Sequence, residues 1–194
     1  MNLIQKSRAQ SGFTLMETMI AIVVLAVGVL GLAGMLADSL TYMNTAQVDY
    51  IAQQKAVEAV ESIFTARDIG QTTWSSICNV SSTVCANGVF LAGAQTLCDP
   101  GPDGILGTSD DYSGSTCAVS ADAILQPTSS GILNVTSLTN ANRIPLSNYS
   151  FQRAITITAV PNVTNLRQIQ VTITYRAGKF QRSYTLTTNI SNFS

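Results

Sequence analysis

The feature that most constrains this 194-residue chain is an apolar segment near its N-terminus. From Thr18 to Ala37 there is no charged residue, and nearly every side chain is aliphatic or absent. In helical form, about 20 such residues cross the hydrocarbon core of a bilayer. Glu17 lies just inside this segment, and a carboxylate costs roughly 2.5–3.5 kcal/mol at mid-bilayer and less near the interface. We therefore predict a membrane-spanning helix whose single acid has a specific partner.

The residues that precede the segment set its orientation. Residues 1–12 contain Lys6 and Arg8 and no acid, so the positive-inside rule places the N-terminus in the cytoplasm and everything after Ala37 outside it. A secretory signal peptide also begins with basic residues, but its apolar core is only about 7–15 residues long. A simple membrane anchor is the other alternative, and it leaves Glu17 unexplained.

The segment Ser11-Gly12-Phe13-Thr14-Leu15-Met16-Glu17 resembles the Gly-Phe-Thr-Leu-x-Glu motif of type IV pilin precursors. The resemblance implies that prepilin peptidase cuts between Gly12 and Phe13 and that Phe13 is then N-methylated. It also implies that Glu17, the fifth residue of the mature chain, acts in assembly with other pilin subunits through their N-terminal helices. Residues 26–34 resemble the minor pilins of the PilV type.

The motif and the composition together predict four segments. Residues 1–12 are a leader peptide, and residues 13–37 form a transmembrane and filament-core helix. Residues 38–69 continue that helix in amphipathic form, and residues 70–194 form an extracytoplasmic globular domain. The expected location is the inner membrane with the domain in the periplasm, and afterwards the cell-surface pilus.

The expected fold class is α+β, with one long helix packed on a C-terminal antiparallel sheet. No Pro or Gly interrupts residues 38–66, and apolar residues recur there every three or four positions: Val48, Ala52, Ala56, Ala59 and Ile63. We expect one helix from Phe13 to about Arg67, stopped by Gly70. Alternating apolar and polar residues predict strands at 154–160, 168–176 and 181–190, the last two joined as a hairpin at Gly178. This arrangement also resembles the pilin fold.

Four cysteines lie in the segment that we expect outside the cytoplasm: Cys78, Cys85, Cys98 and Cys117. An even number in an oxidising compartment predicts two disulfides, with three possible connectivities. The sequential pairing is favoured because each bond then closes a short loop. A zinc site is disfavoured because the chain has no histidine and no C-x-x-C pair.

A Gly-rich acidic segment, residues 99–111, is a candidate Ca²⁺ loop. Asp99, Asp103, Gly104 and Asp110 fit positions one, five, six and twelve of the calcium-loop template, and Asp111 follows. Position three is Gly101 instead of an acid, and no flanking helices are expected, so an EF-hand is not predicted. The alternative is a polar loop of turns between Cys98 and Cys117. The sequence indicates no required cofactor, and Ca²⁺ is the one candidate ion.

The composition disfavours an enzyme and a nucleic-acid-binding protein. Without histidine there is no Ser-His-Asp or Cys-His arrangement, and no phosphate-binding loop is present. The net charge is −1, so binding to DNA is not expected, although cations do gather at the last hairpin. Every acid lies at or before Asp122, and six basic residues follow it: Arg143, Arg153, Arg167, Arg176, Lys179 and Arg182. This polarity predicts either an acidic loop that meets a basic sheet of the next subunit, or two ordinary solvated faces.

These features favour a minor type IV pilin that primes or modifies pilus assembly. Two alternatives share the anchor and the outer domain. One is a minor pseudopilin of a type II secretion system. The other is a membrane-anchored periplasmic protein that binds calcium or another ligand through residues 98–117.

Overall fold

The computed structural model describes residues 12–125 and 143–192. The chain divides into two compact units, residues 1–43 and residues 44–194, and each is described by itself. The main helix, α1, spans Leu15–Asp68, so its first part belongs to one unit and its second part to the other. The predicted leader, residues 1–12, lies outside the described residues except for Gly12.

Both ends of α1 are fixed by local capping. Thr14 precedes the first helical residue, and its Oγ1 accepts a hydrogen bond from the Glu17 backbone N–H at 3.3 Å, as expected for an N-cap. At the other end, Gly70 has a φ of +74°, a conformation that favours glycine and stops the helix. The predicted helix is confirmed, with ends that differ by two residues and by one. Among the described residues, α1 is the one helix long and apolar enough to cross a membrane.

The predicted antiparallel sheet is also confirmed. It contains β1 (Ala94–Thr96), β6 (Gln152–Ala159), β7 (Leu166–Ala177) and β8 (Phe180–Ser191), in that spatial order. The last three strands are the predicted ones, with ends that differ from the prediction by one or two residues. The hairpin between β7 and β8 turns on two residues, and only the first of them, Gly178, has a positive φ (+62°). That pattern is typical of a type II′ turn.

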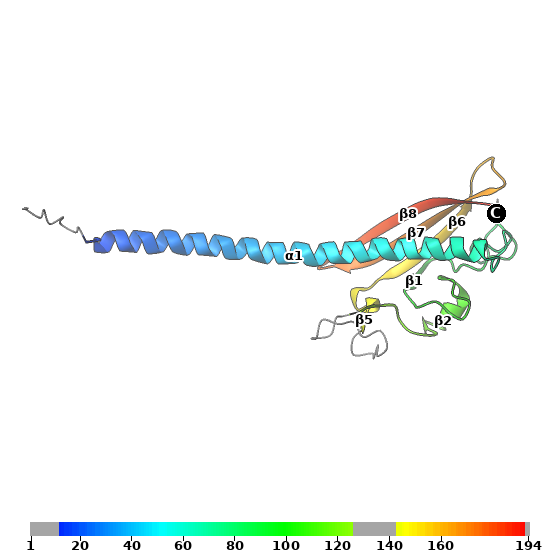
Figure 1. The fold of residues 1–194 in the computed structure, drawn as a ribbon, viewed down its shortest axis with the longest axis horizontal. Helices are drawn as coiled ribbons and strands as arrows, with labels where there is room; N and C mark the ends of the chain where they lie inside the picture. The colour runs from blue at the N-terminus through cyan, green and yellow to red at the C-terminus, as the bar shows by residue number, and fades with distance from the viewer. Residues whose placement is uncertain (1–11, 126–142, 193–194) are drawn as a thin grey trace, which may run out of the picture. The chain divides into compact units, whose positions relative to one another are not determined.

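The core of the second unit lies between α1 and one face of the sheet. Figure 1 shows β7 and β8 running alongside the C-terminal half of the helix. The helix contributes Ala52, Ala56, Ala59 and Ile63, and β7 contributes Ile169, Val171, Ile173 and Tyr175, all buried. Small alanines let the helix approach the sheet closely, while threonines such as Thr185 and Thr187 on the opposite face are exposed. The predicted apolar stripe of the helix therefore meets one face of the predicted strands.

The segment between α1 and the sheet is built from short elements and two disulfides. Two small hairpins pair β2 (Tyr112–Ser113) with β3 (Thr116–Cys117) and β4 (Ala123–Leu125) with β5 (Arg143–Pro145). A short 3₁₀ helix, η1 (Ser109–Asp111), precedes β2, and another, η4 (Leu146–Tyr149), follows β5. The disulfides join Cys78 to Cys85 and Cys98 to Cys117, which is the sequential pairing favoured by the sequence.

Two of the six basic residues that were expected on a charged face are buried. Arg153 is 2% exposed, and its terminal nitrogen lies 3.9 Å from the buried carboxylate of Asp111. Arg167 is 6% exposed, stacks on the Trp74 ring at 4.0 Å and donates hydrogen bonds to the carbonyls of Trp74 and Ile77. Both side chains point to the core face of the sheet because their strand positions have that parity. Arg167 holds the loop that contains Trp74 and Ile77 onto the sheet, and because both arginines are buried, neither is free to meet another subunit.

Candidate processing and assembly site

The predicted cleavage site lies immediately before the helix. Gly12, Phe13 and Thr14 are not helical, and α1 begins at Leu15. Phe13 is 78% exposed, and a Cβ added at Gly12 would meet nothing within 4 Å. The fold of the described residues therefore gives no reason for glycine at position 12. A peptidase needs exposed backbone outside a helix at the scissile bond, and the Gly12–Phe13 bond offers it.

Glu17 lies in the first turn of α1, where its backbone N–H is bonded to the carbonyl and to the hydroxyl of Thr14. A carboxylate is favoured there because the helix dipole leaves partial positive charge at the N-terminus. The residue pattern Thr14-x-x-Glu17 is that of a capping box, which the sequence analysis did not recognise. Thr14 thus has a definite structural role, and it fixes where the helix starts relative to the predicted cut.

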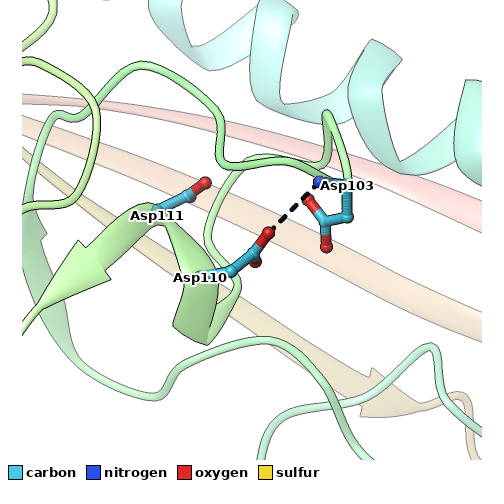
Figure 2. A group of neighbouring side chains, drawn as sticks. All are labelled: Asp103, Asp110 and Asp111. Carbon is cyan, nitrogen blue, oxygen red and sulfur yellow. Dashed lines mark hydrogen bonds between the residues drawn. The ribbon is translucent and has the colours of Figure 1, made fainter.

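The acidic loop brings together three of the four predicted ligands. Carboxylate oxygens of Asp103, Asp110 and Asp111 lie within 4.8 Å of one another, and Figure 2 shows them with the hydrogen bond from the Asp103 N–H to Asp110. Asp99 is not in this group, and its carboxylate accepts a hydrogen bond from the Ser120 hydroxyl. The proposed four-residue ligand set is therefore reduced to three.

Donors from the protein already surround these carboxylates. Asp111 accepts hydrogen bonds from the backbone N–H groups of Gly101 at 2.7 Å and Gly107 at 2.6 Å, and Arg153 lies beside it. Burial raises the pKa of Asp111 above its usual value, although these hydrogen bonds oppose the shift. The loop is thus organised by its own backbone around one buried acid. Whether Asp103 and Asp110 also hold Ca²⁺ stays a prediction.

The pKa of Asp110 shifts in the opposite direction from that of Asp111. Partial burial acts to raise the pKa of Asp110, but hydrogen bonds from the Thr108 hydroxyl (2.5 Å) and the Asp103 N–H (3.2 Å) outweigh it. The pKa of Asp110 is therefore below its usual value, and this carboxylate is ionised at neutral pH. Asp110 is therefore better suited than the buried Asp111 to attract a cation.

A second polar contact, which the sequence did not predict, fixes the β7–β8 hairpin to the helix. The Asp49 carboxylate accepts a hydrogen bond from the Tyr175 hydroxyl at 2.9 Å and forms an ion pair with Arg182 at 2.9 Å. Burial and the hydrogen bond to Asp49 raise the pKa of Tyr175 to about 12. Asp49 thus joins α1 to both strands of the hairpin.

Comparison with known proteins identifies the N-terminal part of the chain. Residues 7–33 match the family model described as the prokaryotic N-terminal methylation motif. Searches of curated proteins and of solved structures give no match. The matched residues include the Gly12–Phe13 junction, the capping Thr14, Glu17 and the first part of the apolar run. Proteins with this motif are structural subunits that prepilin peptidase processes and that assemble with other pilin subunits. The matched motif makes the N-terminal part of this chain similar to type IV pilin precursors, and the apolar helix and the α+β fold fit a membrane-anchored protein of that kind.

Proposed function

We propose that this chain is a minor type IV pilin, a structural subunit without catalytic activity, which enters the pilus and primes or modifies its assembly. The observation that carries the proposal is the position of Glu17, in the first turn of a helix that begins at Leu15, the third residue after the predicted cut, and that has no charged residue from Thr18 to Ala37. In this account the domain after α1 lies in the periplasm before assembly and on the pilus surface afterwards.

Cleavage between Gly12 and Phe13 would create a new positive charge beside that helix. The α-amine of Phe13 would then precede the capping residue Thr14, where the helix dipole disfavours a cation. A carboxylate nearby offsets this cost, and in an apolar bundle two opposite charges attract strongly because the surroundings screen them little. N-methylation of Phe13 leaves this charge in place.

Pairing between subunits follows from the same charges. A helix that enters the bundle with its Glu17 unpaired has an isolated charge in an apolar medium, which is strongly unfavourable. Matching Glu17 with the Phe13 amine of a neighbour removes that cost. We infer that the pair fixes the axial position of each entering subunit, and that the rest of the apolar helix supplies contact area without selecting a register.

The test is substitution of Glu17 by Ala in cells that make the fibres. Glu17→Ala should still be cleaved after Gly12, because the junction lies outside the helix, but its amount in sheared fibres should fall severalfold. Thr18→Ala is the matched control, because it removes a neighbouring polar group and keeps the charge. Normal incorporation of Glu17→Ala would refute the registration role.

The location of the processed protein separates the alternatives. A minor pilin is recovered with surface fibres that shearing releases. A minor pseudopilin of a type II secretion system would stay with the cell envelope and be needed for protein export. An anchored periplasmic binding protein would remain in the membrane fraction and leave both fibre formation and export unchanged.

A further inference from the structure

The base of the β7–β8 hairpin contains a polar hollow that the pilin assignment does not use. It has a volume of about 360 Å³ and is lined by Ser150, Gln152, Tyr175, Arg176, Lys179 and Gln181. The lining contains two cations and no carboxylate. Within residues 12–125 and 143–192, neither Arg176 nor Lys179 forms an ion pair. Two cations with amide and hydroxyl donors around one hollow favour an anionic group as its occupant.

An exposed aromatic ring lies directly beside these cations. Phe180 follows Lys179 at the turn and is 74% exposed, although β8 otherwise directs its apolar side chains toward the core. An aromatic ring next to lysine and arginine is the combination found where proteins meet the headgroup layer of a membrane. At such contacts the ring lies at the apolar boundary while the cations stay at the level of the phosphates.

The hairpin lies at the end of its unit from which the chain leads back to the membrane segment. Tyr175 and Arg182 are held to Asp49 near the start of that unit, whereas Ser191, at the far end of β8, accepts a hydrogen bond from Arg67 near the end of α1. Beyond Tyr175, the strand continues for two residues to the turn. The Gly178–Lys179 turn is therefore the part of the hairpin that lies nearest the end marked by Asn44.

The chain covers a short distance between that end and the lipid. Asn44 lies seven positions after Ala37, the last residue of the uncharged run. At about 1.5 Å per residue in a helix, this is about 10 Å. The headgroup layer on one side of a bilayer is roughly 5–8 Å thick, so the length of the connecting chain is comparable with the thickness of that layer.

We propose that the β7–β8 hairpin docks on anionic phospholipid while the subunit waits in the membrane. Arg176 and Lys179 receive the phosphate of an anionic headgroup in the hollow, and Phe180 inserts beside it. Docking fixes the orientation of the globular unit over the membrane before the subunit is taken up. The proposal rests on the membrane anchoring of α1 and on the outward placement of the domain, but not on entry into a pilus.

The experiment places a fluorescent reporter at the turn of the full-length protein in lipid nanodiscs. Phe180→Trp puts an indole at the proposed contact, and brominated phosphatidylglycerol or phosphatidylcholine quenches an indole that reaches the acyl boundary. The native Trp74 is present in every sample, so quenching is measured against the protein with Phe180 retained. Val163→Trp is the matched control, because Val163 is 45% exposed in the β6–β7 connection at the opposite end of the sheet.

The expected result is quenching at position 180 in phosphatidylglycerol discs, with little at position 163. Adding Arg176→Gln and Lys179→Gln to Phe180→Trp should remove most of that quenching. One cation near an anionic membrane shifts the equilibrium between docked and undocked hairpin by about fivefold, so two cations shift it by about 25-fold. Phosphatidylcholine discs should give much less quenching than phosphatidylglycerol discs.

Three results would overturn the proposal. The first is that the indole at position 180 is not quenched, and the second is that it is quenched equally with and without the two cations. The third is that a DNA duplex removes the quenching by displacing the hairpin from the anionic lipid. Glu17→Ala separates this test from the proposed function. If the hairpin docks but registration by Glu17 is right, that variant is quenched normally at position 180 and still fails to enter fibres.

Discussion

The contact between Tyr175 and Asp49 gives a quantitative test of how the hairpin is held to α1. Tyr175→Phe keeps the ring, which is 4% exposed and stacks on Phe151 with 5.2 Å between ring centroids. It removes only the hydroxyl that donates to Asp49 at 2.9 Å. A hydrogen bond to a charged group contributes about 1.5–3 kcal/mol. The Asp49 side chain is about one-third exposed and keeps its ion pair with Arg182, so we expect a loss of about 1.5 kcal/mol at pH 8.

The same contact makes the difference in stability between the wild type and Tyr175→Phe depend on pH. The pKa of Tyr175 is about 12 in the folded protein and 10.0 for an ordinary tyrosine. Because the folded-state pKa is raised, the stability that the protonated phenol contributes is complete below pH 10 and is lost as the pH rises toward 12. Each pKa unit corresponds to 1.36 kcal/mol, so about 1.4 kcal/mol is lost by pH 11. The advantage of the wild type over Tyr175→Phe should therefore shrink nearly to zero at pH 11.

The assay is urea unfolding of the full-length protein in detergent micelles at pH 8, 9.5 and 11. The single tryptophan, Trp74, packs on Arg167 in the second unit and reports its unfolding by fluorescence. Other tyrosines are present in both proteins, so their titration cancels in the difference. Tyr184→Phe is the matched control, since no hydrogen bond to its hydroxyl forms within the described part of the chain. A wild-type advantage that stays constant from pH 8 to pH 11 would refute the reasoning.

Three further predictions concern the disulfide loop, the cut site and the acidic loop. Replacing Cys98 and Cys117 by Ala should lower the free energy of unfolding by about 3 kcal/mol in denaturant titrations, because the bond closes a loop with a sequence separation of 19. Gly12→Leu should leave the thermal unfolding midpoint unchanged, since a Cβ added at that position meets no atom within 4 Å. The same variant should abolish cleavage in a peptidase assay. A shifted midpoint would contradict the first of these expectations. Calcium titration should release or absorb heat that Asp103→Asn removes, and a wild-type protein without such heat has no calcium loop.

The sequence predicted the long elements because their patterns are strong and local. The stripe from Val48 to Ile63 repeats at helical spacing, and the strands from β6 to β8 alternate with period two, so both the elements and their buried faces could be predicted. The exact first and last residues of these elements were harder to predict. They depend on caps such as Thr14, whose hydroxyl was not recognised as a helix start.

The contacts that could not be predicted join residues far apart in the chain. Asn79 bonds the carbonyl of Ile155 and the N–H of Ile157, thereby covering the part of β6 that β1 leaves unpaired. Nothing near Asn79 in the sequence marks it for that role. The burial of Arg153 was missed for the same reason, because its partner Asp111 is 42 residues away and charge alone indicated a surface residue.

The acidic loop shows how the two limits combine in a candidate site. The spacing of the calcium-loop template correctly predicted that Asp103 and Asp110 lie close together, because a Gly-rich turn between them determines their distance locally. Asp99 fits the same template but lies elsewhere, bonded to Ser120. A sequence template specifies residue types and intervals, whereas the position of Asp99 depends on the disulfide that starts at Cys98 and on the chain that returns through Ser120.

The measurement that tests the central claim most directly is mass spectrometry of the N-terminus of this protein recovered from sheared surface fibres. The account predicts a chain that begins at N-methylated Phe13. That result would establish cleavage after Gly12, methylation and export together. A chain that retains Met1 and is confined to the membrane fraction would contradict the assignment as a pilus subunit.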